Sequence, residues 1–483
     1  MEHNRNSFYI TTPIFYPNGN LHIGHAYTSV IADIFARMSR LSGRPTYFLT
    51  GVDENSLKIE KKAKEAGQEI MPFLDEQTGK IKDIFEKLRV GYDQYIRTTD
   101  PVHHRGVIEM WNRLKKAGDI YEGTYEGLYC VGCESFKTEK DLIDGKCPDH
   151  GVEPEKISEK NYFFRLSKYA DTIAQHIRTG DFLITPVARK NEILAVLEGG
   201  LQDIPFSRPY KGQPNAILVP GDETQSIYVW CDALTNYISA LGFGSSQKTY
   251  YDMFWPAKVH IMGKDILRFH AAIWPAMLLS AGLPLPKQLL VHGLMISGGK
   301  KMSKSLGNIV DPEEMRGIVG AGGLRLYFAH DIPLTGDGEI SKDLIVASYN
   351  AHLANGLGNL TNRLLKMMIS YEVQFDMEKV AHTPVWQKTE AILKESLDNL
   401  DLTGYASYIW KEFASIDKEI QDTEPFKVFK VDPDKARAIV SGMMIKFYTL
   451  VYFTDPILPH TSARIISYIR NRQMPERPLF VKI

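Results

Sequence analysis

The stretch YPNGNLHIGHAYTSVIADIFARM, residues 16–38, decides the fold. Its apolar residues recur every three or four positions, which lays one face of a helix on a core, and residues 42–45 (Ser-Gly-Arg-Pro) end that helix. Upstream, residues 7–16 are rich in β-branched and aromatic side chains and predict a strand, and residues 17–20 predict a turn. Downstream, residues 45–54 predict a second apolar strand that ends in acids. A strand-turn-helix-strand unit predicts an open parallel sheet, whose ligands bind beyond the carboxyl ends of the strands.

Two histidines open the predicted helix. His22 and His25 are three residues apart on its first turn and face the same way. The N-terminus of a helix attracts anions, so two imidazoles there can hydrogen-bond a phosphate chain, and Gly24 lets a backbone or flat ring approach closely. Taken alone, such a pair is more often a surface or capping pair. The rest of the chain has to decide between these interpretations.

The bulk composition predicts a multidomain enzyme in the cytoplasm. With 483 residues, the chain is long enough for about three domains, and it is 44% hydrophobic and 24% charged. No apolar run reaches the length of a membrane span, and the N-terminus resembles neither a signal peptide nor a transit peptide. A net charge of -1 argues against a uniformly basic nucleic-acid binder but leaves room for local basic patches.

Three of the four cysteines crowd into one segment. Cys130 and Cys133 are followed after 13 residues by Cys147 and His150, so two knuckles each offer two ligands. This spacing is typical of a tetrahedral structural zinc site, although Asp149 is an alternative to His150. A disulfide is the competing interpretation and is disfavoured in the cytoplasm. Four protein ligands would leave no open position for chemistry.

A second candidate phosphate element is LMISGGKKMSKSLGNIVDP, residues 294–312. Its two consecutive glycines predict flexibility. Its cations and hydroxyls belong to Lys300, Lys301, Ser303, Lys304 and Ser305. Such a loop can close over a polyphosphate and stabilise charge that develops on a leaving group. The alternative is a solvated basic loop.

HIGH at residues 22–25 together with KMSKS at residues 301–305 resembles the class I aminoacyl-tRNA synthetases, and in detail the methionyl-tRNA synthetase family. The match continues in order through TGVDEN, CVGC, CPDH, YVWCDALTNY, GKDILRFHAAIWPAM and NGLGNLTNR. This resemblance implies a methionine–tRNA ligase. Such an enzyme activates L-methionine with ATP to methionyl-adenylate and pyrophosphate. It then transfers the methionyl group to the 3′ end of tRNA(Met), including initiator tRNA.

The resemblance also implies roles for individual residues. Catalysis would fall to His22, His25, Lys301 and Lys304, and ATP binding to Gly24, Gly263, Asp265 and Ser303. The methionine pocket would comprise Ile14, Tyr16, Asp53, Trp230, Ala233, Leu234, Tyr237, Ile266 and His270. Asp53 would bind the amino group, aromatic rings suit the thioether, and a tyrosine or histidine hydrogen bond to sulfur would help reject leucine and isoleucine. Mg2+ is expected with ATP, without an identifiable protein ligand.

The expected fold is α/β, with a Rossmann-type class I catalytic domain, a zinc-knuckle insertion and a following all-α helical bundle. We assign residues 1–118 and 226–292 to the catalytic domain and residues 119–225 to the connective insertion, which would hold one structural Zn2+. Residues 293–347 form the KMSKS and stem-contact region. From residue 348 to 483, long amphipathic patterns predict the anticodon-binding helices.

In the family the helical domain reads the CAU anticodon. Asn359 and Arg363 lie four apart on one helix face and match family residues that touch the anticodon. Phe426 stands where the family usually has tryptophan, so its ring offers less stacking area and no N–H donor. The chain ends at Ile483 without the appended dimerisation domain of some relatives, so we expect a monomer.

Two alternatives compete with this interpretation. Another class I synthetase is one: the large aliphatic enzymes need an editing domain where this chain carries its zinc knuckles, and a cysteine enzyme needs metal ligands at the amino-acid site. A non-catalytic tRNA-binding paralogue is the other. It would be expected to lose His22, His25, Lys301 or Lys304, and all four are present.

Overall fold

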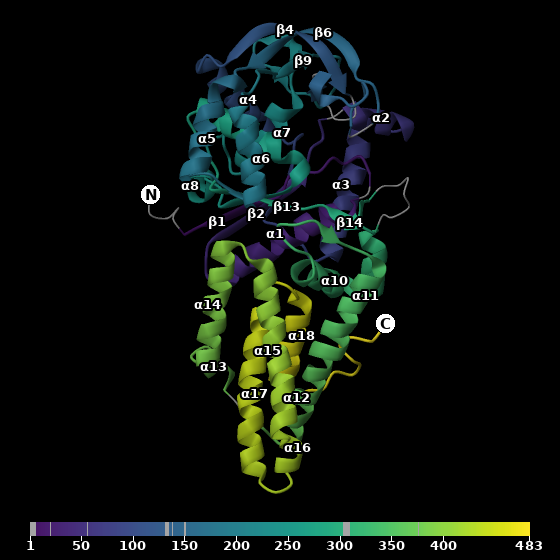
Figure 1. Ribbon diagram of the computed structural model, residues 1–483, viewed down its shortest axis with the longest axis vertical. Coiled ribbons are helices and arrows are strands. Elements are labelled where there is room, and N and C mark those ends of the chain that lie inside the picture. The colour runs from purple at the N-terminus through teal and green to yellow at the C-terminus, as the bar shows by residue number, and fades with distance from the viewer. Residues whose placement is uncertain are drawn as a thin grey trace.

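The structure is a computed structural model of the 483-residue chain. It describes residues 6–19, 21–55, 57–130, 135–137, 139–148, 151–302, 310–374 and 376–483. The molecule is elongated, with the strands gathered in a sheet half (residues 6–302) and long helices in a helical half (residues 310–483), as Figure 1 shows. Among the described helices, none is both long and apolar enough to cross a membrane.

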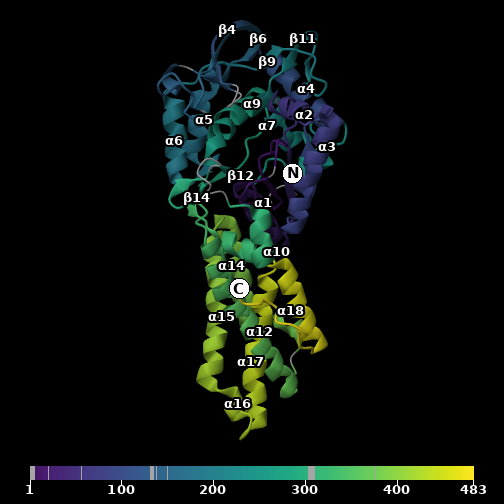
Figure 2. The same ribbon diagram turned by 90° about the vertical axis from the view of Figure 1, so that its right-hand side faces the viewer.

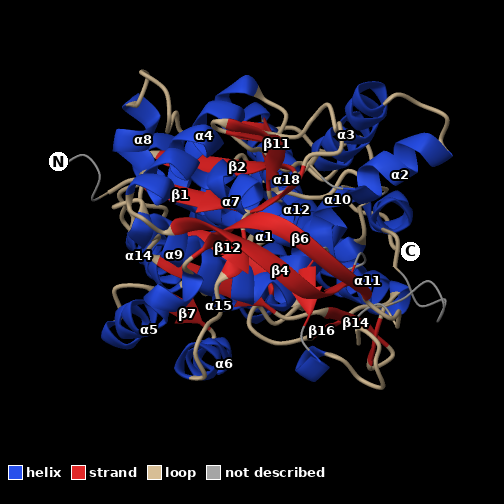
Figure 3. Cartoon of the chain, turned by 90° about the horizontal axis from the view of Figure 1, so that it is seen from above, coloured by secondary structure: helices blue, strands red, loops and turns tan. Residues whose placement is uncertain are grey.

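A six-stranded parallel sheet forms the centre of the sheet half (Figure 3). In spatial order its strands are β3 (Gln94–Arg97), β2 (Thr46–Val52), β1 (Phe8–Thr11), β12 (Val259–Gly263), β13 (Gln288–His292) and β7 (Leu183–Thr185). All neighbouring strands pair in parallel, which confirms the predicted Rossmann-type sheet. The strand order reverses between β1 and β12, and this switch point is where such sheets bind ligands.

The first strand is shorter than predicted. A strand over residues 7–16 is expected from composition, whereas β1 ends at Thr11. Pro13 has no N–H to donate to a ladder, and only Phe15 touches the sheet again, through an isolated bridge to Val52. The chain therefore leaves the sheet early, which brings residues 13–16 over its edge.

Helices cover both faces of this sheet. One face carries Ile10, Phe48 and Ile261 and packs against α1 (Ile23–Leu41) and α3 (Ile70–Lys87) in one apolar cluster. The other face carries Tyr9, Leu49 and Met262 and packs in a second cluster. The helices of that second cluster include α4 (Pro101–Lys116), α5 (Ala170–Thr179), α6 (Val187–Glu198), α7 (Val229–Ser239), α8 (Thr249–Phe254) and α9 (Trp274–Ser280). Alternate strand residues thus face opposite layers.

Helix α1 begins and ends as predicted. It begins at Ile23, one residue after His22, and most of its residues are buried. It ends at Leu41, and Gly43 follows with a φ of 81°, the left-handed conformation that glycine adopts easily after a helix. The remaining helix of this region, α2 (Leu57–Glu65), leads from β2 towards α3. Helix α1 lies between the sheet and the helical half (Figures 1 and 2).

Two antiparallel sheets top the sheet half, far from the helical half (Figure 1). The larger has the order β5 (Ser135–Lys137), β4 (Ile120–Cys130), β6 (Glu155–Phe164) and β8 (Ile204–Pro205). The smaller has the order β10 (Leu218–Val219), β11 (Asp222–Ile227) and β9 (Ser207–Pro209). Both come from the expected insertion, residues 119–225, except that β11 continues to Ile227. The same segment also returns to the central sheet as β7, which the sequence did not indicate.

The helical half begins with α10 (Pro312–His330), which packs on α1. Its other helices are α11 (Lys342–Ser348), a π-helix (Tyr349–Gly358), α12 (Asn359–Ser370), α13 (Met377–Val380), α14 (Pro384–Asn399), α15 (Leu402–Thr423), α16 (Pro425–Val428), α17 (Pro433–Phe453) and α18 (Pro459–Asn471). A third small sheet links the halves, with the order β15 (Lys300–Lys301), β14 (Met295–Ser297) and β16 (Gly338–Glu339).

Candidate active site

A cavity of about 500 Å³ opens at the switch point between β1 and β12. Its walls come from the segments that follow β1, β2, β12 and β13, together with the start of α1 and residues along α7. The sequence-predicted residues that line it are Ile14, Tyr16, His22, Gly24, His25, Asp53, Trp230, Ala233, Leu234, Tyr237, Gly263, Asp265, Ile266 and His270. A volume of this size suits a small-molecule ligand.

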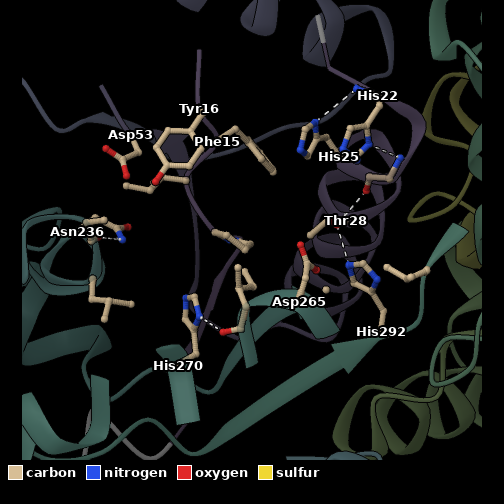
Figure 4. Close-up of a pocket in the computed structure, with 18 of the residues that line it drawn as sticks. Phe15, Tyr16, His22, His25, Thr28, Asp53, Asn236, Asp265, His270 and His292 are labelled. Atoms are coloured by element: carbon tan, nitrogen blue, oxygen red, sulfur yellow. Dashed lines mark hydrogen bonds between the residues drawn. The ribbon is translucent and has the colours of Figure 1, made fainter. Parts of the chain in front are cut away.

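Figure 4 shows that the cavity has two ends. Tyr16, Asp53 and His270 lie towards one end, and His22, His25 and Asp265 towards the other. One end joins a buried carboxylate to aromatic rings, and the other joins imidazoles to the N-terminus of a helix. The two ends therefore suit different parts of a ligand or two different ligands.

The paired histidines cap helix α1. Nδ1 of His22 accepts hydrogen bonds from the backbone N–H of Gly24 at 3.1 Å and of His25 at 3.4 Å. In return, the backbone N–H of His22 donates to Nδ1 of His25 at 3.4 Å. The two rings stack with centroids 3.6 Å apart. Since both Nδ1 atoms accept, both Nε2 atoms carry hydrogen when the rings are neutral, and each can donate.

Both rings are neutral at neutral pH. Burial, with a smaller effect of His22, lowers the pKa of His25 to about 3. Burial also lowers the pKa of His22, although Asp265 opposes this shift. The pair thus offers two N–H donors at the positive end of α1, an arrangement that can hold phosphate oxygens without carrying a charge itself.

Two glycines make room for these polar groups. A Cβ on Gly24 would lie 3.0 Å from Cε1 of His22, so a side chain there would displace the capping ring. A Cβ on Gly263 would lie 2.7 Å from Oδ1 of Asp265. Both glycines therefore set the positions of neighbouring polar side chains. Whether Gly24 also leaves room for an adenine remains a prediction.

The other end of the cavity is apolar and aromatic, with one buried carboxylate. Trp230 stacks on Phe269 with ring centroids 3.7 Å apart and an interplanar angle of 15°. Asp53 is 3% exposed at the end of β2, and its Oδ1 accepts the backbone N–H of Asn55 at 3.1 Å. Leu234 is buried beside them on α7. A wall of rings around a carboxylate suits a ligand with an apolar chain and a cationic group.

Tyr237 and His270 already use their hydrogens within the protein. Nδ1 of His270 lies 3.0 Å from the carbonyl oxygen of Ile266, so it donates, and Nε2 accepts from the hydroxyl of Tyr237 at 2.7 Å. Burial lowers the pKa of His270 to about 4, so the ring stays neutral. In this structure both side chains have their hydrogens engaged within the protein, and the hydrogen bond from a tyrosine or histidine to sulfur stays a prediction.

The sequence reasoning missed several residues that line the same cavity, namely Phe15, Thr28, Asn236 and His292. The hydroxyl of Thr28 lies 2.8 Å from Nε2 of His292, and the rings of Phe15 and His25 are 4.9 Å apart. Thr28 lies one turn after Gly24 on α1, and His292 is the last residue of β13. Because parallel sheets bind ligands at the carboxyl ends of their strands, the position of His292 at a strand end is the signal that could have identified it.

Known proteins match almost the whole chain. A family model described as "tRNA synthetases class I (M)" matches residues 8–156 and 141–365. The methionine–tRNA ligase of Clostridium perfringens is 41% identical over 475 residues, which cover 96% of this chain and 73% of that protein. The methionine–tRNA ligase of Thermotoga maritima is 36% identical, over 97% of this chain and 76% of that protein. The chain belongs to the class I methionyl-tRNA synthetases.

Solved structures of this family superpose on the chain. Mycobacterium tuberculosis methionyl-tRNA synthetase in complex with methionyl-adenylate matches with a TM-score of 0.89 and 33% identity, over 98% of this chain and 95% of that one. The apo form of the same enzyme matches with a TM-score of 0.84 and 30% identity, over 100% and 99% of the two chains. The predicted fold, a class I Rossmann-type catalytic core followed by a helical region, is therefore confirmed, and the zinc knuckle stays a prediction.

The family's KMSKS segment begins at the rim of the cavity. Gly298 and Gly299 form the two-residue turn between β14 and β15 with φ values of 62° and 70°, as a type I′ hairpin requires. The carboxylate of Glu339 accepts hydrogen bonds from both of their N–H groups. These two hydrogen bonds stabilise the turn formed by the glycines that were predicted to be flexible. Lys301 ends β15, and Met302 lines the cavity. Ser303 and Lys304 lie outside the described residues.

Two of the four predicted zinc ligands belong to the described residues. Cys130, at the end of β4, and Cys147 are both fully buried. The N–H of Gly151 donates to the carbonyl oxygen of Cys147 at 2.7 Å. Two buried cysteine side chains suit a soft metal. Cys133 and His150 lie outside the described part of the chain.

The predicted anticodon residues belong to the helical half. Arg363 forms an ion pair with Asp417 of α15, and Nδ2 of Asn359 donates to the carbonyl oxygen of Asn355 at 3.2 Å. Phe426 is 48% exposed on α16, at the end of the molecule away from the sheet (Figure 1). An exposed ring has a free face for stacking, whereas Arg363 would share its guanidinium between Asp417 and any base.

Proposed function

We propose that this chain is a methionine–tRNA ligase that makes methionyl-adenylate from L-methionine and ATP and then charges tRNA(Met), including initiator tRNA. The observation that carries this function is the agreement of relatives that are named methionine–tRNA ligases and are 36–41% identical over 96–97% of this chain. The complex of a structural relative with methionyl-adenylate supports the first step.

In the first step a methionine carboxylate oxygen attacks the α-phosphorus of ATP. The new P–O bond forms as the bond to pyrophosphate breaks, and pyrophosphate leaves with the electron pair. Asp53 binds the ammonium group, which fixes the carboxylate for attack. The Nε2–H groups of His22 and His25 donate to phosphate oxygens, and Lys301 and Lys304 stabilise the charge on the leaving pyrophosphate.

ATP binds beside Gly24, Gly263, Asp265 and Ser303, with its adenosine part at the first three of these residues. When bound with ATP, Mg2+ neutralises part of the phosphate charge. Within the described lining of the cavity, the carboxylates are Asp53 and Asp265, and both have assigned roles. We therefore assign no protein ligand to this ion and expect it to be held by the phosphates and water.

The methionine side chain occupies the aromatic end of the cavity. Its wall comprises Ile14, Tyr16, Trp230, Ala233, Leu234, Tyr237, Ile266 and His270. Sulfur–ring contacts favour a thioether here by up to about 1.5 kcal/mol each. Since Tyr237 donates to His270, selection against leucine and isoleucine comes from shape and from these contacts.

In the second step a ribose hydroxyl at the 3′ end of the tRNA attacks the methionyl carbonyl carbon, and AMP leaves. We assign the acceptor end to the zinc-knuckle insertion, residues 119–225, and the anticodon to the helical domain, residues 348–483. Residues 1–118 with 226–292 make up the catalytic domain, and residues 293–347 the KMSKS and stem-contact region. A structural Zn2+ held by Cys130, Cys133, Cys147 and His150 would hold the knuckles together. The enzyme acts in the cytoplasm as a monomer.

One experiment tests the assignment. Pyrophosphate exchange with Mg-ATP, measured across the twenty amino acids, should be rapid with methionine alone. Equal or faster exchange with isoleucine, valine, leucine or cysteine would identify another class I synthetase. A chain that binds tRNA(Met) but supports no exchange would be a non-catalytic paralogue.

A further inference from the structure

A cluster of potential metal ligands lies outside the active site, where α10 meets the π-helix. His330 is the last residue of α10, Asp331 caps that helix, and His352 lies in the π-helix. One ligand atom from each of the three lies within 4.8 Å of the others. The two imidazole rings have centroids 4.4 Å apart. Nothing in the proposed reaction uses these residues.

The spacing of the His330 and Asp331 ligand atoms suits two ligands of a tetrahedral ion. Nδ1 of His330 lies 3.4 Å from Oδ1 of Asp331. Two ligands bound tetrahedrally at zinc distances are separated by about 3.3 Å. This contact lacks hydrogen-bond geometry, and among the described residues the buried Nδ1 of His330 finds no other partner. A buried nitrogen without a hydrogen bond is costly, and a metal ion would satisfy it.

The neighbouring side chains orient the carboxylate. The hydroxyl of Ser348 donates to Oδ2 of Asp331 at 2.6 Å, which leaves Oδ1 for the histidine side of the cluster. Metal-binding carboxylates are typically held by such an outer hydrogen bond. One ligand atom of His330, of this oriented carboxylate and of His352 therefore lies within 4.8 Å of the other two.

We propose that His330, Asp331 and His352 bind a divalent transition metal ion, Zn2+ by preference, with water as the fourth ligand. Two imidazoles favour Zn2+, Cu2+ or Ni2+ over Mg2+, which prefers oxygen ligands.

The position of the site gives it a structural role. Helix α10 packs on α1 beneath the active site, and the π-helix continues into α12 of the helical half. Trp410 of α15 lies beside both imidazoles, with ring centroids 6.1 Å from His330 and 6.4 Å from His352. A bound ion would fix the first segments of the helical half to one another. This inference does not depend on the proposed aminoacylation.

Metal counting on the intact chain tests the site. The purified protein, saturated with Zn2+ and freed of excess by gel filtration, should hold one more zinc ion per chain than the His352→Gln variant. The His382→Gln variant, which changes an exposed histidine of the same half, should match the unaltered chain. Unchanged circular dichroism and methionine-dependent exchange would show that His352→Gln folds, and the knuckle zinc serves as an internal reference. Equal zinc content in His352→Gln and the unaltered chain would overturn the proposal.

Two further measurements distinguish a specific metal site from nonspecific metal binding. Ser348→Ala should weaken Zn2+ binding at this site by about 10- to 100-fold in calorimetry, because it frees the carboxylate to rotate. Cu2+ should quench the fluorescence of Trp410, and this quenching should disappear in both Trp410→Phe and His330→Gln. Quenching that survives in His330→Gln, or unchanged affinity in Ser348→Ala, would leave only an ion-pair cluster and refute the assignment.

Discussion

Arg325 of α10 and Asp33 of α1 form an ion pair of 2.7 Å that is closed to solvent, with side-chain exposures of 1% and 0%. The same guanidinium donates to the carbonyl oxygens of Pro456 and Ile457 at 2.8 Å, and to that of Leu88 at 3.2 Å. One buried side chain thus ties the helix that carries the paired histidines to the turn between α17 and α18. It also sets how the helical half sits on the catalytic sheet.

Arg325→Met should lower the free energy of unfolding by about 3–5 kcal/mol, because it takes the guanidinium away from a buried carboxylate and from the carbonyl groups of Pro456, Ile457 and Leu88. Urea unfolding followed by circular dichroism measures this loss. Arg37→Met is the matched control: Arg37 pairs with the same Asp33 at 2.9 Å but is 25% exposed, so its loss should change stability by at most about 1 kcal/mol. Equal effects of the two variants would contradict the assigned role.

Tyr237→Phe should impair methionine activation without unfolding the chain. The change removes the donor to Nε2 of His270 and leaves that nitrogen unsatisfied in a buried site, at a cost of about 1–3 kcal/mol. We therefore expect kcat/KM for methionine in pyrophosphate exchange to fall roughly 5- to 150-fold. Tyr250→Phe, at a tyrosine that is 55% exposed, should leave it unchanged. An unaltered kcat/KM in Tyr237→Phe would show that the pair does not position the pocket.

The buried state of His25 predicts a pH dependence of stability. Its folded pKa is about 3, whereas an unfolded histidine has a pKa of about 6.5. Above pH 6.5 both states are neutral; as the pH falls from 6.5 towards 3, only the unfolded chain gains this proton. The free energy of unfolding therefore falls on acidification, by up to about 1.4 kcal/mol per pH unit from this residue.

His25→Gln should remove that part of the slope. Urea unfolding at several pH values between 4 and 7.5 would compare the variants, and only the slope matters, since the substitution also weakens the cap of α1. His382→Gln should keep the slope of the unaltered chain. Parallel pH profiles for His25→Gln and the unaltered chain would mean that His25 takes up a proton in the folded state.

The main helices and strands of the catalytic sheet, and the residues at its ligand-binding edge, could be predicted from the sequence. The spacing of apolar residues predicts α1, residues 42–45 predict its end, and the composition of residues 45–54 predicts β2. The HIGH motif and Asp53 both follow predicted strands, so their meeting at one edge of a parallel sheet follows from topology. Local sequence patterns were sufficient wherever the structure depended on a single helix or strand.

Contacts between segments far apart in the sequence could not be predicted from such local patterns. β7 joins the central sheet from within the predicted insertion because it pairs with β13, a partner about a hundred residues away that no local period reveals. The hydrogen bond from Tyr237 to His270 depends on the carbonyl oxygen of Ile266. This oxygen accepts the N–H of Nδ1 and so leaves Nε2 of His270 as the acceptor for Tyr237. Phe269 stacks on Trp230 from a π-helical turn, a geometry that helical spacing does not predict.

Lys301→Ala should slow adenylate formation strongly while barely changing the affinity for methionine. A cation aimed at the leaving pyrophosphate acts mainly in the transition state, and the loss of one such contact costs about 3 kcal/mol. Pre-steady-state adenylate formation gives the rate, and methionine-dependent protein fluorescence gives the affinity. Lys342→Ala, at an exposed lysine of α11, should leave both unchanged. An unchanged rate in Lys301→Ala would exclude the KMSKS lysine from catalysis.

Anticodon recognition should begin with the release of Arg363 from Asp417. The two side chains form an ion pair, and each is between a third and two fifths exposed, so water already weakens their attraction. A single-stranded base can therefore compete for the guanidinium by accepting its N–H groups. Phe426 offers an exposed ring for stacking, which contributes about 1–3 kcal/mol per base.

Arg363→Ala should reduce charging of a CAU-anticodon tRNA by about one to two orders of magnitude, at roughly 1.4 kcal/mol per factor of ten. Phe426→Ala should act in the same direction but less, and Phe426→Trp should improve charging by enlarging the stacking face. Methionine-dependent pyrophosphate exchange should stay intact in all three, since that reaction does not involve the anticodon. Asp417→Asn removes the competing carboxylate while Arg363 remains, so it should preserve charging.

Two results would contradict this assignment. If Arg363→Ala reduced exchange and charging equally, or if Asp417→Asn reduced charging as much as Arg363→Ala, the pair would be a structural link between α12 and α15. The anticodon assignment would then be wrong.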